Sequence, residues 1–170
     1  SAVSVSKGPG SYTGLRIGVS TAKGICFALD IPLISVDTLK NMAHGVVSQG
    51  IEADLYCPMI DARRMEVYAE IYDKNLNVVR KVNADIVDGQ TYSKFLEEKK
   101  VCFFGDGMAK CKELLSTFYN ALFVERIEPS AKYMVELATE KFLKREFEDV
   151  AYFEPYYLKD FIAGKPKKLL

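Results

Sequence analysis

Histidine is almost absent from this sequence, because His44 is the only one in 170 residues. A paired-histidine metal site cannot be built from one imidazole, and no second ring is available for a proton relay. His44 lies in "KNMAHG", which is typical of the end of a helix, where an imidazole usually sits near the last carbonyls. We therefore expect no histidine-based metal chemistry.

An excess of charge of either sign is also missing, since 23 basic side chains balance 23 acidic ones. The overall charge therefore gives no reason to expect tight, sequence-independent nucleic-acid binding. Cysteines in C-x-x-C spacing and a signal-peptide pattern are absent, which favours a reduced, cytoplasmic chain. The longest apolar run, "GICFALDIPLISV", is broken by Asp30 and Pro32, so we expect no membrane-spanning segment and no membrane partner.

The first fifty residues alternate between strand and helix patterns. "AVSVS" (residues 2–6) predicts a strand, and residues 13–29 predict a helix with one apolar stripe. A buried strand over residues 31–36 and a helix capped by Asp37 follow. The expected stripe residues are Leu15, Val19, Ala22, Cys26 and Leu29. Such an order is typical of a parallel sheet with helical crossovers.

A composition change at "SQGIEAD" (residues 48–54) predicts a boundary, after which the patterns read β-β-β-α-β-α-β-α. We expect strands at 55–60, 66–72, 77–87 and from 101 and 121, and helices at 91–99, 108–119 and 130–145. This order predicts a mixed five-stranded sheet in an α/β fold of the actin-like or ribonuclease-H-like type. We expect a duplicated domain with a truncated first copy, divided into residues 1–50, residues 51–163 and a mobile tail, 164–170.

The stretch "SKGPGSYTGLRIGVSTAKG" (residues 6–24) resembles a phosphate-binding turn but fits the known motifs poorly. Its third glycine comes one residue too late for a dinucleotide fingerprint, and its lysine precedes the glycines that a P-loop lysine would follow. A general anion site at the helix start stays open, as does a tight turn without a ligand. The candidate anion-binding residues are Gly8, Gly10, Ser11, Thr13 and Arg16.

Small residues continue into the helix in two rows spaced by four. One row holds Gly14, Gly18 and Ala22, and the other holds Ser20, Gly24 and Ala28. A glycine inside a helix costs roughly 1 kcal/mol relative to alanine, so close approach of a neighbouring backbone is the usual compensation. The pattern leaves open whether that neighbour is the protein's own sheet or a helix of a partner.

Four stretches carry a family resemblance. They are "KGPGSYTGLRIGVSTAKGICFALDIPLISVDTLKNMA" (7–43), "MIDARRMEVYAEIY" (59–72), "GDG" (105–107) and "EPYYLKDF" (154–161). With these motifs in this order, the chain resembles the TsaB (YeaZ) family of the bacterial tRNA threonylcarbamoylation machinery. Members of that family usually begin with a strand hairpin and a helix before the strand that is first here, so we expect those elements to be missing.

The resemblance implies two actin-like domains and a subunit that has no catalysis or cofactor of its own. It would bind and stabilise a homologous catalytic subunit, TsaD, work with the ATPase TsaE, and meet tRNA only through the complex. The helix at 13–29 would contact TsaD, or a second copy in a homodimer. Its expected interface residues are Gly14, Leu15, Ile17, Gly18, Thr21, Ala22, Gly24 and Ile25.

Other chemistry is weighed against structural uses of the same residues. An actin-type, nucleotide-dependent enzyme using the Gly-Pro-Gly turn is the alternative function, although Asp106 in "GDG" more often caps a helix. "DARR" (61–64) fits an anion pair or tRNA contact, or an exposed ion pair. The tyrosines near the C-terminus fit base stacking or a packed tail. The peptidase activity suggested by the name glycoprotease is not supported by a single histidine.

Overall fold

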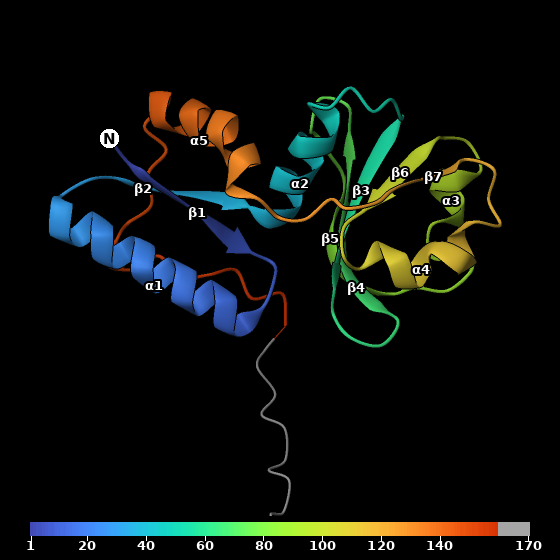
Figure 1. Ribbon diagram of the computed structural model, residues 1–170, viewed down its shortest axis with the longest axis horizontal. Coiled ribbons are helices and arrows are strands. Elements are labelled where there is room, and N and C mark those ends of the chain that lie inside the picture. Colours follow the sequence, from blue (N-terminus) through green and yellow to red (C-terminus); the bar gives the residue numbers. More distant parts are fainter. Residues whose placement is uncertain (160–170) are drawn as a thin grey trace, which may run out of the picture.

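The computed structural model describes residues 1–159, so the predicted tail at 164–170 lies outside the described residues. The first part of the chain builds a two-stranded parallel sheet with helices around it (Figure 1). Its elements are β1 (Val3–Gly8), α1 (Tyr12–Leu29), β2 (Leu33–Asp37) and α2 (Thr38–Val47). The predicted strand, helix, strand, helix order is confirmed, with boundaries shifted by one or two residues.

The second part contains the five-stranded sheet that the sequence predicts, in the order β5-β4-β3-β6-β7. Strand β3 pairs antiparallel with β4 and parallel with β6, so the sheet is mixed. Its elements are β3 (Leu55–Asp61), β4 (Glu66–Asp73), β5 (Val78–Ile86), α3 (Ser93–Leu96), β6 (Val101–Phe104), α4 (Met108–Leu115) and β7 (Ala121–Val124).

Apolar side chains cover both faces of this sheet. On one face, Met59 and Phe103 pack with Leu115 of α4. On the other face, Tyr56 and Phe104 pack with Leu39, Met42 and Val46 of α2. Burial of each large apolar side chain contributes about 1.5–3 kcal/mol. Helix α2, which belongs to the first part of the chain by sequence, contacts β1 and β2 and packs its apolar side chains on the second sheet, so it joins the two sheets.

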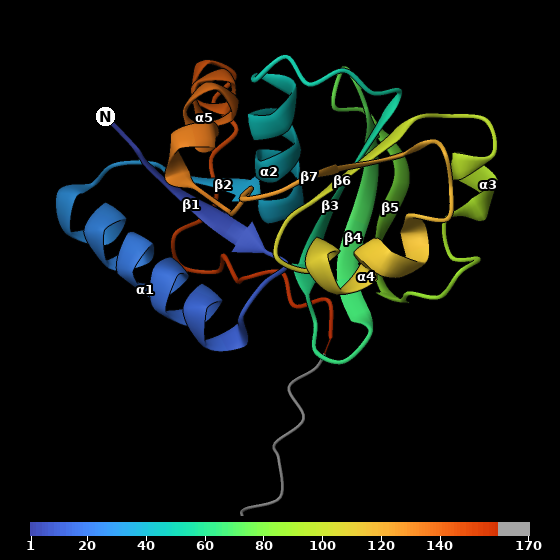
Figure 2. The same cartoon turned by 45° about the vertical axis from the view of Figure 1, so that its right-hand side comes forward.

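The last helix lies against the first sheet. A short 3₁₀ turn (Ala131–Tyr133) leads into α5 (Met134–Leu143), and the β1–β2 sheet lies between α1 and α5 (Figures 1 and 2). Lys141 Nζ donates to the Ser35 carbonyl at 2.8 Å, and the Glu148 amide donates to the Leu33 carbonyl at 2.9 Å. The sequence grouped this helix with the sheet of residues 51–163, but its contacts join it to β2.

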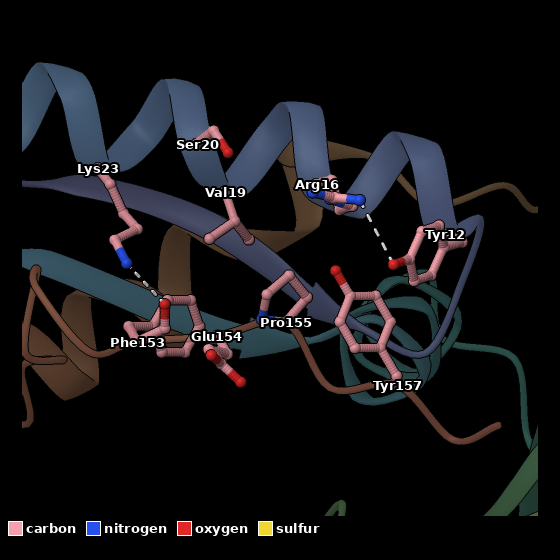
Figure 3. A pocket seen from close by; sticks show the side chains of 9 residues that line it. All are labelled: Tyr12, Arg16, Val19, Ser20, Lys23, Phe153, Glu154, Pro155 and Tyr157. Atoms are coloured by element: carbon pink, nitrogen blue, oxygen red, sulfur yellow. Dashed lines mark hydrogen bonds between the residues drawn. The ribbon is translucent and has the colours of Figure 1, made fainter. Parts of the chain in front are cut away.

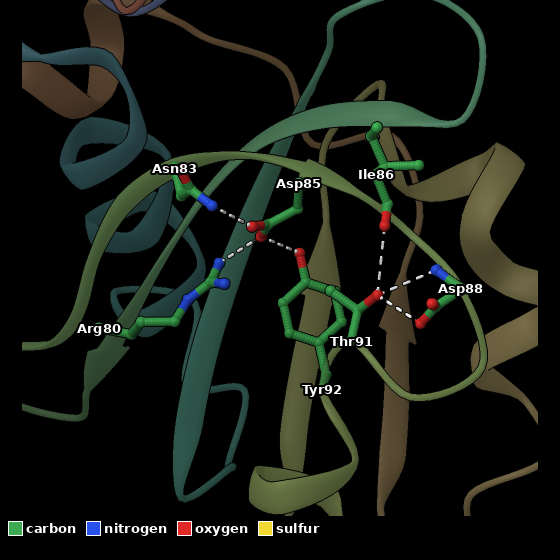
Figure 4. A network of polar contacts seen from close by, with 7 residues as sticks. All are labelled: Arg80, Asn83, Asp85, Ile86, Asp88, Thr91 and Tyr92. Atoms are coloured by element: carbon green, nitrogen blue, oxygen red, sulfur yellow. Dashed lines mark hydrogen bonds and ion pairs between the residues drawn. The ribbon is translucent and has the colours of Figure 1, made fainter.

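Three predicted helices, at 91–99, 108–119 and 130–145, are shorter in the structure. At 91–99 the helix covers only Ser93–Leu96, since the Asp88 carboxylate accepts bonds from Gln90 N and Thr91 Oγ1 and holds a turn. Side chains that bond nearby backbone compete with helix formation. Tyr92 is then buried, and its hydroxyl donates to Asp85 (Figure 4). Helix α4 ends at Leu115, before the predicted Tyr119.

Two aspartates predicted to cap helices make no cap bond with their side chains, although Asp37 does lie at the N-cap position of α2. The Asp37 side chain makes no cap bond to α2 and instead forms an ion pair with Lys7 at 3.2 Å. Asp106 does not cap α4, because its Oδ1 accepts a 3.0 Å bond from the Asp61 amide across the neighbouring strand. In both cases the carboxylate interacts with a residue of a neighbouring strand, Lys7 of β1 or Asp61 of β3.

No helix within residues 1–159 is both long enough and apolar enough to cross a membrane.

Candidate functional site

Helix α1 has one face buried by its own chain and an opposite face that is open. Leu15, Val19, Ala22 and Cys26 are buried, as the apolar periodicity predicts. Leu29, the fifth predicted stripe residue, is instead 64% exposed, because the helix ends there and Asp30 turns the chain with a left-handed conformation. Leu15 and Ala22 therefore lie away from the open face, which corrects their assignment to an interface.

The other predicted interface residues lie outside this buried stripe. Gly14, Ile17, Thr21, Gly24 and Ile25 are exposed, and we call these five residues the outer face of α1. Ile17 is 64% exposed and Ile25 is 42% exposed. A large apolar side chain at that exposure on a helix with small neighbours is typical of a surface that another molecule covers.

The two rows of small residues prove to have different neighbours. A Cβ at Gly18 would lie 3.9 Å from Val5 of β1, and Ala22 is buried, so these two residues of the first row pack against the protein itself, whereas Gly14 is exposed. Ser20, Gly24 and Ala28 are all exposed, and a Cβ at Gly24 would meet no atom within 4 Å. The sequence did not decide whether the neighbour of each row is the protein's own sheet or a partner. Within the described residues, Gly18 has a neighbour on the protein's own sheet and Gly24 has none within 4 Å.

Phe27 is an exposed residue that the sequence reasoning missed. Its side chain is 85% exposed, close to the C-terminal end of α1. The signal was available, because Phe27 immediately follows Cys26 and so cannot share the buried stripe of a helix with 3.6 residues per turn. Phe27 and Leu29 extend the apolar exposure beyond the predicted interface residues.

The Gly-Pro-Gly turn delivers the chain from β1 to α1. Ser11 is the N-cap, and its Oγ accepts a 3.3 Å bond from the Gly14 amide. Thr13 lies inside the helix, in its first turn. Gly8 is buried and has φ +114°, so only glycine fits there without strain.

A cleft of about 760 Å³ opens where this turn faces the second sheet. The carboxyl ends of β1, β3 and β6 lead toward it, which is where α/β proteins usually bind ligands. Three of the predicted anion-binding residues, Gly10, Ser11 and Thr13, line the cleft. Its other lining residues are Tyr12, Ile60–Arg63, Glu66, Tyr68, Asp106 and Tyr157–Lys159.

Two carboxylates of the cleft, Asp61 and Glu66, are paired with lysines. Lys110 Nζ donates to Asp61 Oδ1 and to the Glu66 carbonyl, and Lys159 forms an ion pair with the Glu66 carboxylate. The Lys110 hydrogen bond and the Arg63 amide lower the pKa of Asp61 below its usual value. In "DARR" the carboxylate therefore pairs with a lysine of α4, while the side chains of Arg63 and Arg64 are exposed.

Arg16, the fifth predicted anion-binding residue, lies on the flank of α1 and outside this cleft. Its guanidinium sits 5.5 Å from the centre of the Tyr12 ring. With Lys23, Phe153 and Tyr157 it lines a smaller hollow of about 330 Å³ between α1 and the chain that follows α5 (Figure 3). The structure thus gathers Gly10, Ser11 and Thr13 at one cleft and separates Arg16 from them.

His44 has a structural partner. Its Nε2 lies 2.9 Å from Glu136 Oε2, which links α2 to α5. This position in the last turn of α2 agrees with the predicted helix end, although the bond goes to a carboxylate on another helix.

Comparisons with known proteins agree with this architecture. A family model described as "TsaD: tRNA N6-adenosine threonylcarbamoyltransferase" matches residues 1–167. A solved structure from Pseudomonas aeruginosa, described as similar to the peptidase YeaZ, superposes with a TM-score of 0.78 at 24% identity, covering 93% of this chain and 73% of that one. The expected α/β, actin-like fold is confirmed, and the chain belongs to the family that this family model describes.

The relatives that match much of the chain are TsaB proteins, as the sequence motifs predict. TsaB of Bacillus subtilis is 36% identical over 68% of this chain and 50% of its own length. TsaB of Haemophilus influenzae is 29% identical over 96% of this chain and 72% of its own length. Both are named tRNA threonylcarbamoyladenosine biosynthesis proteins. The chain thus spans about half of the first relative and under three quarters of the second.

Proposed function

We propose that this chain acts in the formation of threonylcarbamoyladenosine in tRNA, as a subunit without chemistry of its own. It binds and stabilises a TsaD-like catalytic subunit through the outer face of α1. A TsaE-like ATPase and tRNA are reached through the resulting complex, and a second copy of the chain can take the TsaD position in a homodimer. The names of the TsaB relatives support the pathway.

The observation that carries the proposal is the position of Gly24. A glycine within a helix costs about 1 kcal/mol relative to alanine, and no atom of residues 1–159 would lie within 4 Å of a Cβ at Gly24. A helix of a partner that packs directly on the backbone at Gly24 accounts for that cost. The exposed Ile17 and Ile25 on the same face would supply the apolar contacts of the interface.

The composition of the cleft supports a non-catalytic role. Its carboxylates Asp61 and Glu66 are held by Lys110 and Lys159, so they are engaged in ion pairs on the protein itself. The only histidine, His44, is bonded to Glu136. A general acid or base must reach a proton of the substrate, whereas these three groups are bonded to other side chains of the protein.

The test is co-purification of this protein with a TsaD-like subunit from the same organism. Gly24→Leu places a bulky side chain where the partner backbone would lie, and we expect it to abolish the complex. The matched control is Gly89→Leu, because Gly89 also faces open space but lies far from α1 in sequence. Gly50 faces open space too, but its φ of +74° would strain a leucine. An undiminished complex with Gly24→Leu would refute the proposal.

Calorimetry distinguishes the proposed interaction subunit from the alternative function. A nucleotide-dependent enzyme that uses the Gly-Pro-Gly turn should give binding heat with ATP and magnesium on the isolated protein. The proposed interaction subunit should give none.

A further inference from the structure

The chain that follows α5 runs back beneath α1 and is fixed there by a lysine. Lys23 Nζ donates to the carbonyls of Ala151 and Phe153, at 3.1 and 2.9 Å. Phe153 also packs against the core formed by Cys26 and Leu33. From this anchor, residues 153–159, which we call the strap, continue along the flank of α1 toward the turn that begins the helix (Figure 3).

The far end of the strap contacts both sheets. The Tyr156 amide donates a 2.7 Å bond to the carbonyl of Lys7 on β1. The Tyr157 ring lies 4.8 Å from the Tyr12 ring at the start of α1. Lys159 then forms its ion pair with Glu66 on β4 of the second sheet. The strap thus joins the first sheet to the second across the mouth of the cleft.

The backbone of the turn is shaped to receive the strap. A Cβ at Gly8 would lie 2.5 Å from the Tyr156 carbonyl oxygen, a distance that no side chain tolerates. The next glycine of the turn, Gly10, is much less restricted, because its nearest atom would be 4.0 Å away. The strap backbone therefore approaches β1 at the one position of the turn where a side chain is excluded.

We propose that the strap is a releasable latch that forms one wall of the cleft. Two contacts hold it, and we call them its fastenings: the aromatic one joins Tyr157 to Tyr12, and the ionic one joins Lys159 to Glu66. With both closed, Tyr157–Lys159 line the space outside the carboxyl ends of β1, β3 and β6, where other α/β proteins hold ligands. Release of the latch removes this wall of the cleft beside Tyr12, which is half-buried. This inference does not depend on the proposed partner of α1.

The ionic fastening makes the latch sensitive to salt. The side chain of Lys159 is 48% exposed and that of Glu66 is 19% exposed, so dissolved ions reach the pair. Screening weakens such a pair as ionic strength rises. The aromatic fastening between Tyr12 and Tyr157 carries no such dependence.

Hydrogen exchange at the Tyr156 amide measures the latch directly, because that amide is bonded only while the strap is seated. In the full chain we expect the double variant Tyr157→Ala, Lys159→Met to accelerate its exchange about tenfold. Exchange at Phe103, in the core of the second sheet, should stay unchanged. The control is Tyr152→Ala, since Tyr152 lies just before the strap and is 84% exposed.

A salt series gives the second readout. Raising the salt concentration should accelerate Tyr156 exchange in the natural sequence and have no effect in Lys159→Met. The proposal is overturned if the double variant exchanges Tyr156 at the original rate, or if the salt effect persists in Lys159→Met. Loss of protection at Phe103 in the double variant would also overturn it, because the contacts would then support the whole fold instead of a local closure.

Discussion

Gly18 and Gly24 lie on the same helix, but among the described residues of the chain only Gly18 has a close neighbour. A Cβ at Gly18 would contact Val5 at 3.9 Å, whereas a Cβ at Gly24 would meet nothing within 4 Å. We therefore expect Gly24→Ala to raise the free energy of unfolding of the isolated protein by about 1 kcal/mol, since alanine is the better helix former. Urea unfolding followed by circular dichroism measures the difference.

Gly45 of α2 is the matched glycine for that experiment. A Cβ there would lie 2.6 Å from the Tyr133 ring, so Gly45→Ala should lower the free energy of unfolding even though it also adds helix propensity. If Gly24→Ala were to destabilise the protein as Gly45→Ala does, the face of α1 at Gly24 would not be open.

The turn before α1 predicts a contrast between its two glycines. Gly8→Ala should lower the free energy of unfolding by about 2 kcal/mol or more, because alanine is strained at φ +114° and its Cβ meets the Tyr156 carbonyl. Gly10→Ala should change it by less than about 0.5 kcal/mol, as for an ordinary surface substitution. Thermal unfolding of the two variants checks this, and equal losses would contradict the packing described at Gly8.

A buried carboxylate holds the end of β5 in place. Asp85 accepts bonds from Arg80, from Asn83 Nδ2 at 2.9 Å and from the Tyr92 hydroxyl at 2.7 Å (Figure 4). Asp85→Ala leaves the half-buried Arg80 without its counter-charge and should cost about 3 kcal/mol in the free energy of unfolding. Tyr92→Phe removes one of the three donors and should cost about 1.5 kcal/mol. Chemical unfolding of both variants tests this order, which would be refuted by the larger loss in Tyr92→Phe.

The ion pair between Asp61 and Lys110 predicts a dependence on pH. The pKa of Asp61 in the folded protein lies below the usual 3.8, so its stabilising effect is complete above that value. The effect is lost as the pH falls through the lower folded pKa, because protonation then removes the negative charge in the folded state as well.

Comparison with Asp61→Asn isolates this charge. The natural sequence should be the more stable at about pH 6, and the difference should shrink as the pH falls below 3.8. A difference in the free energy of unfolding that stays constant over that range would show that the charge of Asp61 contributes nothing.

Much of the fold could be predicted from the sequence because it follows from local periodicity. The apolar spacing of Leu15, Val19, Ala22 and Cys26 placed the buried face of α1, and the strand patterns gave the mixed five-stranded sheet. Helix ends were less predictable, because side chains such as Asp88 bonded the backbone in competition with the helix.

The remaining differences arise from contacts between residues distant in sequence. The partners of Lys141 and Glu148 lie on β2, so nothing local placed α5 beside the first sheet. Likewise Gly18 and Gly24 carry the same local signal, and only the position of Val5 beside Gly18 distinguishes the glycine that packs internally from the one that is open. The expected division of the chain at residue 50 stays a prediction.

The most direct test of the account is the affinity of this protein for a TsaD-like subunit from the same organism, measured by titration calorimetry with Ile17→Asp. A charge at the centre of the outer face of α1 should weaken binding at least about a hundredfold, whereas Tyr119→Asp, at a fully exposed position after α4, should leave it unchanged. Binding of Ile17→Asp at the original affinity would contradict the account.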